Sequence, residues 1–407
     1  MLVKNLQVLS YKKKAREWAF SFMEDTMQLQ GNEGRSIIHY GALPYEVALA
    51  EAAEHTRGKF TQIINRGKEK SPSLMEELLE NSPKDYLVDT ALLDFECSEE
   101  AGITVAFGSG RFPIHRNAIH HLAQRSEIFT IGVMDKMMKN GSWAQEMLTD
   151  CLRRTYRNID RDRVLVRVSR GKVKAILSDS YLRIDSADLV ASVIEALMSN
   201  SLVVTDAQVG EVSWSITAAI PSIFEPIKND PIMWGFQITN SDYGKGALSI
   251  KTLVERLMCT NKATIKDVYN RVHLGAKLPD NIVLAQDTLK AQSAFFTGVF
   301  RDFMSSFLDR ASVSKEMKSL HATATSPVPD HEDIIKTISK KSGITAGTSK
   351  EVAEAYTSFD VEMLPPAPKE GSLWRLSNAF SLIANQRTDF DEVQALQSAA
   401  GQVLLLA

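Results

Sequence analysis

The sequence predicts an α+β fold, in which an antiparallel sheet is covered by helices and helical additions lie on its N- and C-terminal sides. Three observations lead to this class. A hairpin pattern with a period of two residues lies over 164–177, a polar, glycine-containing loop at 240–246 separates a second pair of strand-like runs, and a helical period prevails after residue 262. Strands joined by short turns favour antiparallel pairing, because a parallel pair needs a longer crossover.

The 407 residues are enough for two or three domains. We expect a helical or mixed N-terminal region over residues 1–100, an α+β core domain over 101–320 and a C-terminal helical module over 330–407. Breaks rich in Pro, Ser and Thr at 322–329 and 365–368 set this last module apart.

The N-terminal region carries short helical patterns. Helices are predicted over 45–53 and 74–79, and Ser71-Pro72 predicts a break before the second, because proline disrupts a helix interior. The lysine run 12–14 lies in a basic arm that also contains aromatic residues. Such a run is typical of a solvated helix face and also occurs in proteins with anionic partners.

The next segment contains a glycine-bearing turn. A strand over 103–107 leads into Gly108-Ser109-Gly110, and a helix is predicted to begin at Pro113. The glycine spacing fits neither a Walker loop nor a dinucleotide fingerprint, so it predicts a plain turn. Three histidines share the predicted helix, namely His115, His120 and His121. No acidic third ligand follows them at a fixed offset, so we expect no metal site there.

The clearest strand signal is a hairpin over 164–177. Apolar residues alternate with other residues along 164–168 and again along 172–177, and Ser169-Arg170-Gly171 supplies the turn. Further elements are predicted in this order: an amphipathic helix over 187–198, a strand over 212–220, a second hairpin over 234–250 and a long helix over 285–312. The long helix carries a stripe of Phe and Met, which indicates packing in a core or at an interface.

Composition excludes several classes of protein. The 47 basic and 50 acidic residues give a net charge of −3, and no run approaches the roughly 20 apolar residues of a membrane span. We therefore expect a cytoplasmic protein without a membrane partner. The three scattered cysteines, Cys97, Cys151 and Cys259, indicate a reducing compartment. No cofactor motif is visible, and we expect no cofactor and no catalytic residue.

The stretch from 113 to 261 resembles a family of phage, plasmid and prophage proteins known as domain of unknown function 932. Four ordered pieces carry the resemblance. They are IHRNAIHHLAQR at 114–125, VLVRVSRGKVKAILSDSYLRID at 164–185, NSDYG at 240–244 with RLMCTN at 256–261, and LWRLSNA at 373–379. The chain departs from the family pattern at Lys262, where the family has a glycine.

The resemblance implies an α+β core, a location on mobile genetic elements and no established catalytic activity. If the protein is phage-encoded, its compartment is the host cytoplasm. The order of hairpin, helix and strand is also similar to the core of phage single-strand annealing proteins, which is an analogy at the level of fold.

A local excess of positive charge coincides with the first hairpin. Between 153 and 174 there are nine basic residues against two acidic ones, in a chain that is slightly acidic overall. Cations grouped in this way suit a phosphate backbone, because neutralising phosphates releases counterions. Arg167, Lys172 and Lys174 are expected to project from one face of the hairpin, with Arg170 in the turn. The predicted nucleic-acid-binding residues are Arg163, Arg167, Arg170, Lys172, Lys174 and Tyr181, the last as a partner for base stacking.

Three functions remain open from the sequence. The first is a DNA-associated protein that binds or anneals single-stranded DNA through the basic hairpin, as a homo-oligomer with contacts from the helix over 285–308. The second is a non-enzymatic interaction protein that acts on a host defence or replication complex. The third is a hydrolase with a pocket formed by Asp179, Asn240-Ser241-Asp242 and Thr260-Asn261, although no established hydrolase or phosphate-loop motif supports it.

Overall fold

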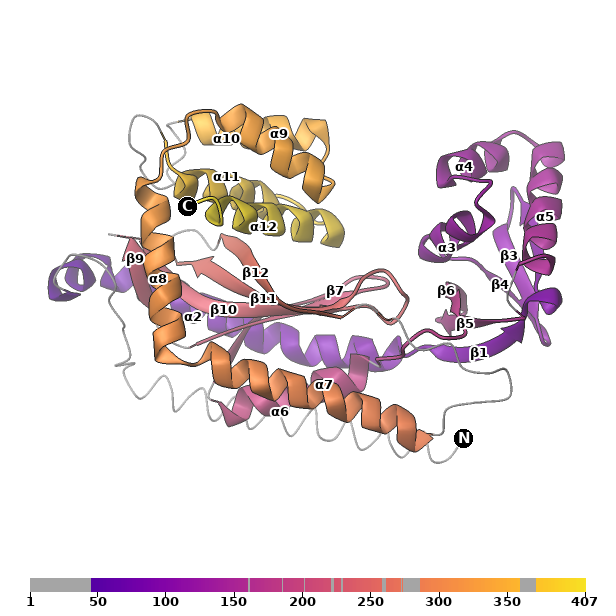
Figure 1. Ribbon diagram of the computed structural model, residues 1–407, viewed down its shortest axis with the longest axis horizontal. Coiled ribbons are helices and arrows are strands. Elements are labelled where there is room, and N and C mark those ends of the chain that lie inside the picture. The colour runs from indigo at the N-terminus through magenta and orange to yellow at the C-terminus, as the bar shows by residue number, and fades with distance from the viewer. Residues whose placement is uncertain are drawn as a thin grey trace.

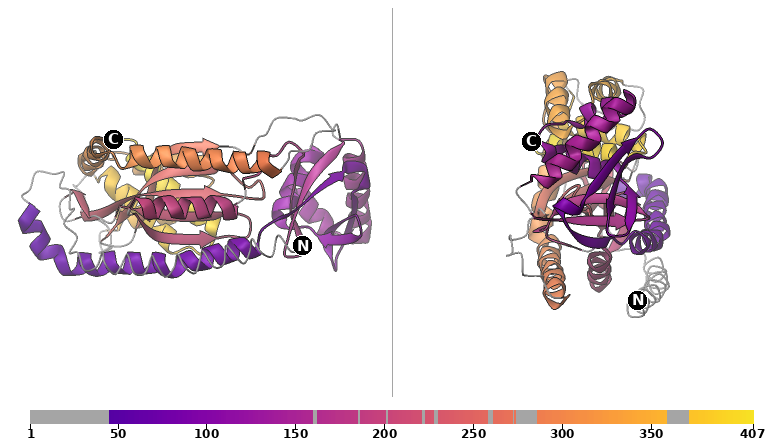
Figure 2. Two further views of the ribbon diagram at one scale, coloured as in Figure 1. Left: turned by 90° about the horizontal axis from the view of Figure 1, so that it is seen from below. Right: turned by 90° about the vertical axis from the view of Figure 1, so that its right-hand side faces the viewer.

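The computed structural model describes residues 45–407 apart from 160–161, 185, 201, 221–222, 228–229, 258–260, 272, 274–285 and 359–370. The predicted basic arm, Cys259, Thr260 and the 365–368 break therefore lie outside the described residues. The molecule is elongated, with a small lobe and a large lobe side by side along its longest axis (Figures 1 and 2).

The small lobe combines two three-stranded antiparallel sheets with three helices. One sheet has the order β1-β5-β6 and the other the order β2-β3-β4. The elements are β1 (Lys84–Asp89), the 3-10 turn η1 (Thr90–Leu92), β2 (Asp94–Ser98), β3 (Gly102–Phe107), β4 (Gly110–Pro113), α3 (Arg116–Ser126), α4 (Ile131–Lys139), α5 (Ser142–Arg157), β5 (Arg163–Ser169) and β6 (Lys172–Ser178). Its core packs Phe95, Leu122 and Val166 in one buried cluster.

The large lobe is built on a six-stranded antiparallel sheet with the order β12-β11-β10-β8-β7, and β9 pairs with β10 outside this order. The strands are β7 (Val203–Val209), β8 (Trp214–Ala219), β9 (Phe224–Ile227), β10 (Asp230–Asn240), β11 (Leu248–Arg256) and β12 (Lys262–Arg271). The helices are α2 (Tyr45–Glu80), α6 (Ser186–Ser199), α7 (Gln286–Phe307), α8 (Arg310–Thr325), α9 (His331–Ser342), α10 (Ala346–Thr357), α11 (Leu373–Asn385) and α12 (Phe390–Leu404).

Helices cover both faces of the large sheet. In Figure 1, α6 and α7 run below the sheet and α9 to α12 lie above it, while the second view shows α2 alongside α6 and α7 (Figure 2). The aromatic stripe of α7 packs inward, because Phe300, Phe303 and Phe307 all contact the ring of Phe236 on β10. The stripe therefore belongs to the core, although Phe295 at its start is 62% exposed.

The predicted break at Ser71-Pro72 is wrong. A single helix, α2, runs through this pair from Tyr45 to Glu80, with Pro72 inside it. The hydroxyl of Ser71 donates to the carbonyl of Gly67 one turn earlier, and Gly67 lies so close to the β7 backbone that a Cβ there would meet the carbonyl oxygen of Val204. Tertiary packing along β7 thus holds the helix through the proline.

The predicted fold class is confirmed, with antiparallel sheets covered by helices and a helical C-terminal region. The turn after 103–107 joins β3 to β4, and Pro113 ends β4 instead of starting a helix, which begins three residues later. The three-part domain division remains a prediction. The α+β core range 101–320 contributes strands and helices to both lobes.

Among the described residues, no helix combines the length and apolar character needed to span a bilayer.

Candidate functional site

The predicted basic hairpin exists and consists of β5 and β6. Arg170 and Gly171 form its turn with φ angles of 48° and 72°, which is the left-handed geometry of a tight hairpin turn. The register shifts between Arg167 and Val168, so a bulge interrupts the regular alternation of faces. The hairpin therefore does not present its cations as one exposed row.

Arg167 is the clearest departure from the sequence prediction. Its side chain is only 1% exposed, whereas a phosphate-binding residue was expected to project from the surface. Its Nε donates to Asp85 on β1 at 2.8 Å, and its Nη1 donates to the carbonyl of Asp242 in the loop after β10. The guanidinium thus links the small lobe to the large lobe, and the expectation that it faces solvent is wrong.

Lys174 is buried as well, at 6% exposure. Its ammonium donates to the carbonyl of Glu211 at 2.7 Å and lies 5.2 Å from the ring centroid of Tyr243. Burial lowers the pKa of Lys174, and burial also raises the pKa of Tyr243 to about 12. Both groups belong to the contact between the lobes, so the expected projection of Lys174 from an exposed face is wrong too.

The remaining cations of the hairpin differ in exposure. Arg170 is exposed and pairs with Glu77 at 2.8 Å and with Glu80 at 3.4 Å, both on α2. Lys172 is exposed beside the turn, and Arg163 at the start of β5 is half-buried. Acidic residues at the end of α2 therefore neutralise much of the positive charge that the sequence places at the hairpin turn.

Tyr181 is engaged inside the protein. Its ring stacks on that of His273 with centroids 5.0 Å apart and an interplanar angle of 5°, and the Arg167 guanidinium lies 5.9 Å from its ring centroid. Its hydroxyl donates to the carbonyl of Ser241. A ring face that already holds an imidazole is not available to a base, so the structure gives Tyr181 a different stacking partner from the one expected.

Among the described residues considered for a hydrolase, the loop 240–242 and Asn261 do not lie together. The side chain of Asp242 accepts from the backbone N–H of Ser186 at 3.1 Å and from its hydroxyl at 2.6 Å, and Asn240 donates to the same hydroxyl. Asn261 lies at the opposite end of the β10–β11 pair, about 25 Å away along the strands, and donates to Asn378 on α11. The loop 240–242 instead caps the junction of sheet and helix.

His121, one of the three histidines considered for a metal site, is a core residue. It is 8% exposed, and its Nδ1 accepts from the N–H of Ile176 on β6. Among the described residues, no group of three His, Cys, Asp or Glu side chains has the arrangement of a metal site. Burial, helped by the nearby Arg125 and His120, lowers the pKa of His121 to about 4.

The depressed pKa of His121 predicts a stability that falls in mild acid. Between pH 6.5 and about 4 the unfolded chain binds a proton that the folded chain does not, so folding is favoured less as the pH falls through this window. The free energy of unfolding of the wild-type protein should therefore fall between about pH 7 and about pH 4.5. We expect this fall to be smaller by about 2 kcal/mol in His121→Gln, which keeps an acceptor for Ile176. Urea titrations of both proteins measure this, and equal losses would contradict the assignment.

The sequence prediction missed a row of cations on α2. Lys59, Arg66 and Lys70 are spaced by seven and four residues, so at 100° per residue they lie within about 40° of one another on the helix. Between 57 and 70 there are five basic residues and one acidic one. The spacing was visible in the sequence, but the predicted helices covered only 45–53 and 74–79, which left this stretch outside any helix.

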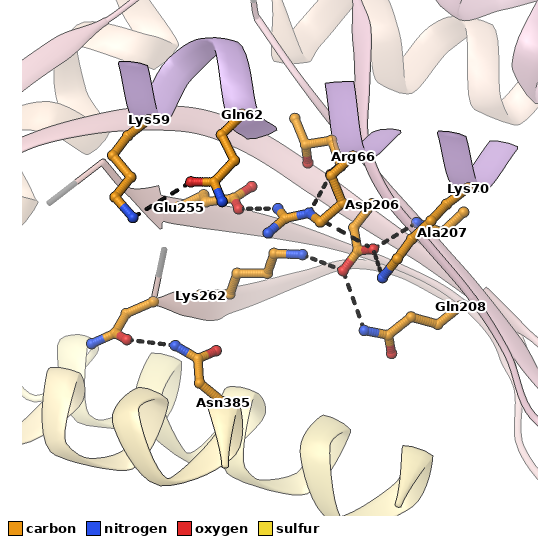
Figure 3. A network of polar contacts seen from close by, with 12 residues as sticks. Lys59, Gln62, Arg66, Lys70, Asp206, Ala207, Gln208, Glu255, Lys262 and Asn385 are labelled. Carbon is orange, nitrogen blue, oxygen red and sulfur yellow. Dashed lines mark hydrogen bonds and ion pairs between the residues drawn. The ribbon is translucent and has the colours of Figure 1, made fainter. Parts of the chain in front are cut away.

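Beneath this row lies a buried network of charges (Figure 3). Asp206 on β7 accepts from Lys70 at 2.7 Å and from Lys262 on β12, and it lies 4.0 Å from Arg66. Arg66 also donates to Glu255 on β11 and, through Nε, to the carbonyl of Thr205. Burial alone would raise the pKa of Asp206, but Lys262 and Arg66 outweigh it and hold the pKa well below its usual range.

A groove of about 570 Å³ opens beside the same row. Its described lining belongs to α2 and is polar, namely Gly58, Lys59, Thr61, Gln62, Asn65, Arg66 and Glu69. In Figure 3 the side chains of Arg66 and Lys70 extend from α2 toward the charged network. Lys59 donates to the amide oxygen of Gln62 at 3.4 Å. All of the described lining residues lie on this one helix, so the groove is an open surface and not an enclosed pocket.

Searches against protein-family models, curated proteins and solved structures give no match to this chain. The resemblance to domain of unknown function 932 therefore stays a prediction from the quoted motifs.

Proposed function

We propose that the protein is a DNA-associated protein of the phage or plasmid type that binds single-stranded DNA through phosphate contacts along α2. The observation that carries the proposal is the row of Lys59, Arg66 and Lys70 beside a polar groove. Lysine, arginine, asparagine and glutamine are among the side chains that contact phosphate oxygens, and all four types line the groove.

The exposure of Arg66 and Lys70 supports phosphate binding. The side chains of Arg66 and Lys70 are 27% and 44% exposed, although each also reaches a buried carboxylate. An ammonium group has three donors, and the described ion pair of Lys70 uses one of them. Two of the hairpin cations offer less, because Arg167 and Lys174 are buried. Arg170 and Lys172 are exposed, and Arg170, like Arg66 and Lys70, already has carboxylate partners.

The preference for a single strand over a duplex is part of the proposal. It follows the analogy, at the level of fold, with phage single-strand annealing proteins. Oligomer formation and strand annealing remain predictions that belong to the same proposal.

Fluorescence anisotropy with labelled single-stranded and duplex oligonucleotides tests the proposal. We expect tighter binding of the single strand and an affinity that falls with salt, with a logarithmic slope of about −2 for three phosphate contacts. Titrations at about 50 and about 150 mM salt give that slope. Absence of binding to either form, or binding that salt does not weaken, would contradict it.

A further inference from the structure

Helix α12 crosses the large sheet on the face opposite α7 (Figure 1). At one end of the helix, Gly401 lies so close to β12 that a Cβ there would meet the carbonyl oxygen of Thr264. At the other end, the side chain of Phe390 lies against Gly210 in the turn between β7 and β8. Because β11 and β10 lie between β12 and β8 in the order of the sheet, the helix passes over these two strands.

The side of α12 that faces the sheet is polar. Gln394 and Gln397 lie between the two contact points along the helix. At 100° per residue they share an arc of about 60° with Phe390 and Gly401, which touch the sheet. The fully buried Leu396 lies on a different side of the helix. The apolar packing of α12 is therefore not directed at the strands below it.

The face of the sheet beneath α12 is polar as well. Gln237 follows Phe236 on β10, and the ring of Phe236 packs against α7, so the side chain of Gln237 points to the opposite face. Ser249 on β11 pairs with Thr239 and lies on that same face. Gln237 and Ser249 are only 3% and 6% exposed, so α12 and its neighbours close this face to water.

Four buried polar atoms of these two surfaces have no hydrogen-bond partner among the described residues. They are Oε1 of Gln237, the hydroxyl oxygen of Ser249, Nε2 of Gln394 and Oε1 of Gln397. A buried polar group without a partner is costly, because it has lost water and gained nothing in return. The contact between α12 and the sheet is therefore weaker than a core contact, and polar contacts are typical of parts of a chain that move relative to one another.

The two ends of α12 are held differently. The backbone of Gly401 packs directly on that of β12, whereas the contacts at the other end include the ion pair of Asp391 with Lys245, whose side chains are 53% and 38% exposed. An exposed ion pair contributes little to stability. We propose that α12 is a lid that lifts off the polar face of the sheet at its Asp391 end, with the contact at Gly401 as its fixed point. This inference goes beyond the proposed function and needs no DNA.

Alkylation of a cysteine placed beneath α12 tests the lid. Ser249→Cys introduces a thiol under the lid. Thr252→Cys is the matched control, because Thr252 is also a buried hydroxyl residue of β11 but pairs with Phe236 and faces α7. A disulfide between Gly210→Cys and Phe390→Cys would lock the lid, since a Cβ at Gly210 lies 3.6 Å from the Cβ of Phe390, within the range of disulfides.

Mass spectrometry of the peptide that carries each new cysteine gives its rate of reaction with iodoacetamide. We expect the lock to slow the alkylation of Ser249→Cys by about tenfold or more, because the thiol reacts only while the lid is open. The rate for Thr252→Cys should stay within about twofold. No slowing of Ser249→Cys, or equal slowing at both positions, would overturn the inference.

Asp391→Asn covers the case in which the disulfide does not form. Loss of the exposed ion pair with Lys245 should speed the alkylation of Ser249→Cys by about twofold to fivefold and leave that of Thr252→Cys unchanged. Equal rates for Ser249→Cys with and without Asp391 would then overturn the lid. The anisotropy titrations decide separately on DNA binding along α2, so failure of one proposal is distinguishable from failure of the other.

Discussion

Replacement of Asp206 by asparagine is expected to lower the free energy of unfolding of the large lobe by about 3 to 5 kcal/mol. The carboxylate is 5% exposed and joins Lys70 on α2 to Lys262 on β12. Its removal leaves the buried ammonium of Lys262 without its anion, and an unpaired buried charge is far more costly than the pair was favourable.

Urea unfolding followed by tryptophan fluorescence measures this effect, because Trp214 and Trp234 lie in the core of the same sheet. The matched control is Asp391→Asn, which removes a half-exposed carboxylate that pairs with Lys245 at the surface. That change should cost no more than about 1 kcal/mol. A loss of similar size in both variants would show that the Asp206 network does not hold α2 and β12 together.

The same carboxylate predicts acid sensitivity. Because the pKa of Asp206 lies below its usual value near 3.8 in the folded state, the contribution of this carboxylate to the free energy of unfolding is complete above that value and is lost as the pH falls below it.

Removing both charges in Asp206→Asn with Lys262→Met should recover part of the stability lost in the single variant, since the uncompensated ammonium is gone.

The second large effect is expected at the junction of the lobes. Arg167→Met should lower the free energy of unfolding by about 3 kcal/mol, because Asp85 and the carbonyl of Asp242 lose a buried donor that bridges them. Lys172→Met, which removes a cation five residues later on the same hairpin, should change it by less than about 0.5 kcal/mol, since that side chain is exposed.

Thermal and urea denaturation of the two variants check this contrast. Arg167→Met should also expose the contact between the lobes to cleavage by a protease at lower denaturant concentration than the wild-type protein. Equal stability of Arg167→Met and Lys172→Met would mean that Arg167 does not connect the lobes.

Local patterns in the sequence predicted part of the sheets. The hairpin of β5 and β6 follows from alternation, α6 from helical spacing, and the pair β10–β11 from the polar, glycine-containing loop between its two runs. β7, with the sequence VVTDAQV, was missed. Its Asp206 is a carboxylate in a buried strand, and the ion pairs with Lys70 and Lys262 offset the cost of burying it. Tertiary partners of this kind are not visible in a local pattern.

The position of the basic residues in the chain was visible, but their environment was not. Arg167 and Lys174 lie in a run that reads as a solvated face, yet Asp85 and Glu211, which bind them, lie 82 and 37 residues away. The environment of Lys262, where the resemblance to domain of unknown function 932 predicts a glycine, was not visible in the sequence either. Lys262 is buried, and the carboxylate of Asp206 compensates its charge.

The affinity of Lys59→Glu for single-stranded DNA, measured beside that of Lys172→Glu, tests the central claim most directly. Both variants reverse one lysine charge, so their net effect on long-range attraction is the same. The α2 site predicts that Lys59→Glu weakens binding about tenfold and reduces the salt slope by about 1, while Lys172→Glu stays within about twofold of the wild-type protein. A loss confined to Lys172→Glu would place the phosphate contacts at the hairpin and contradict the account.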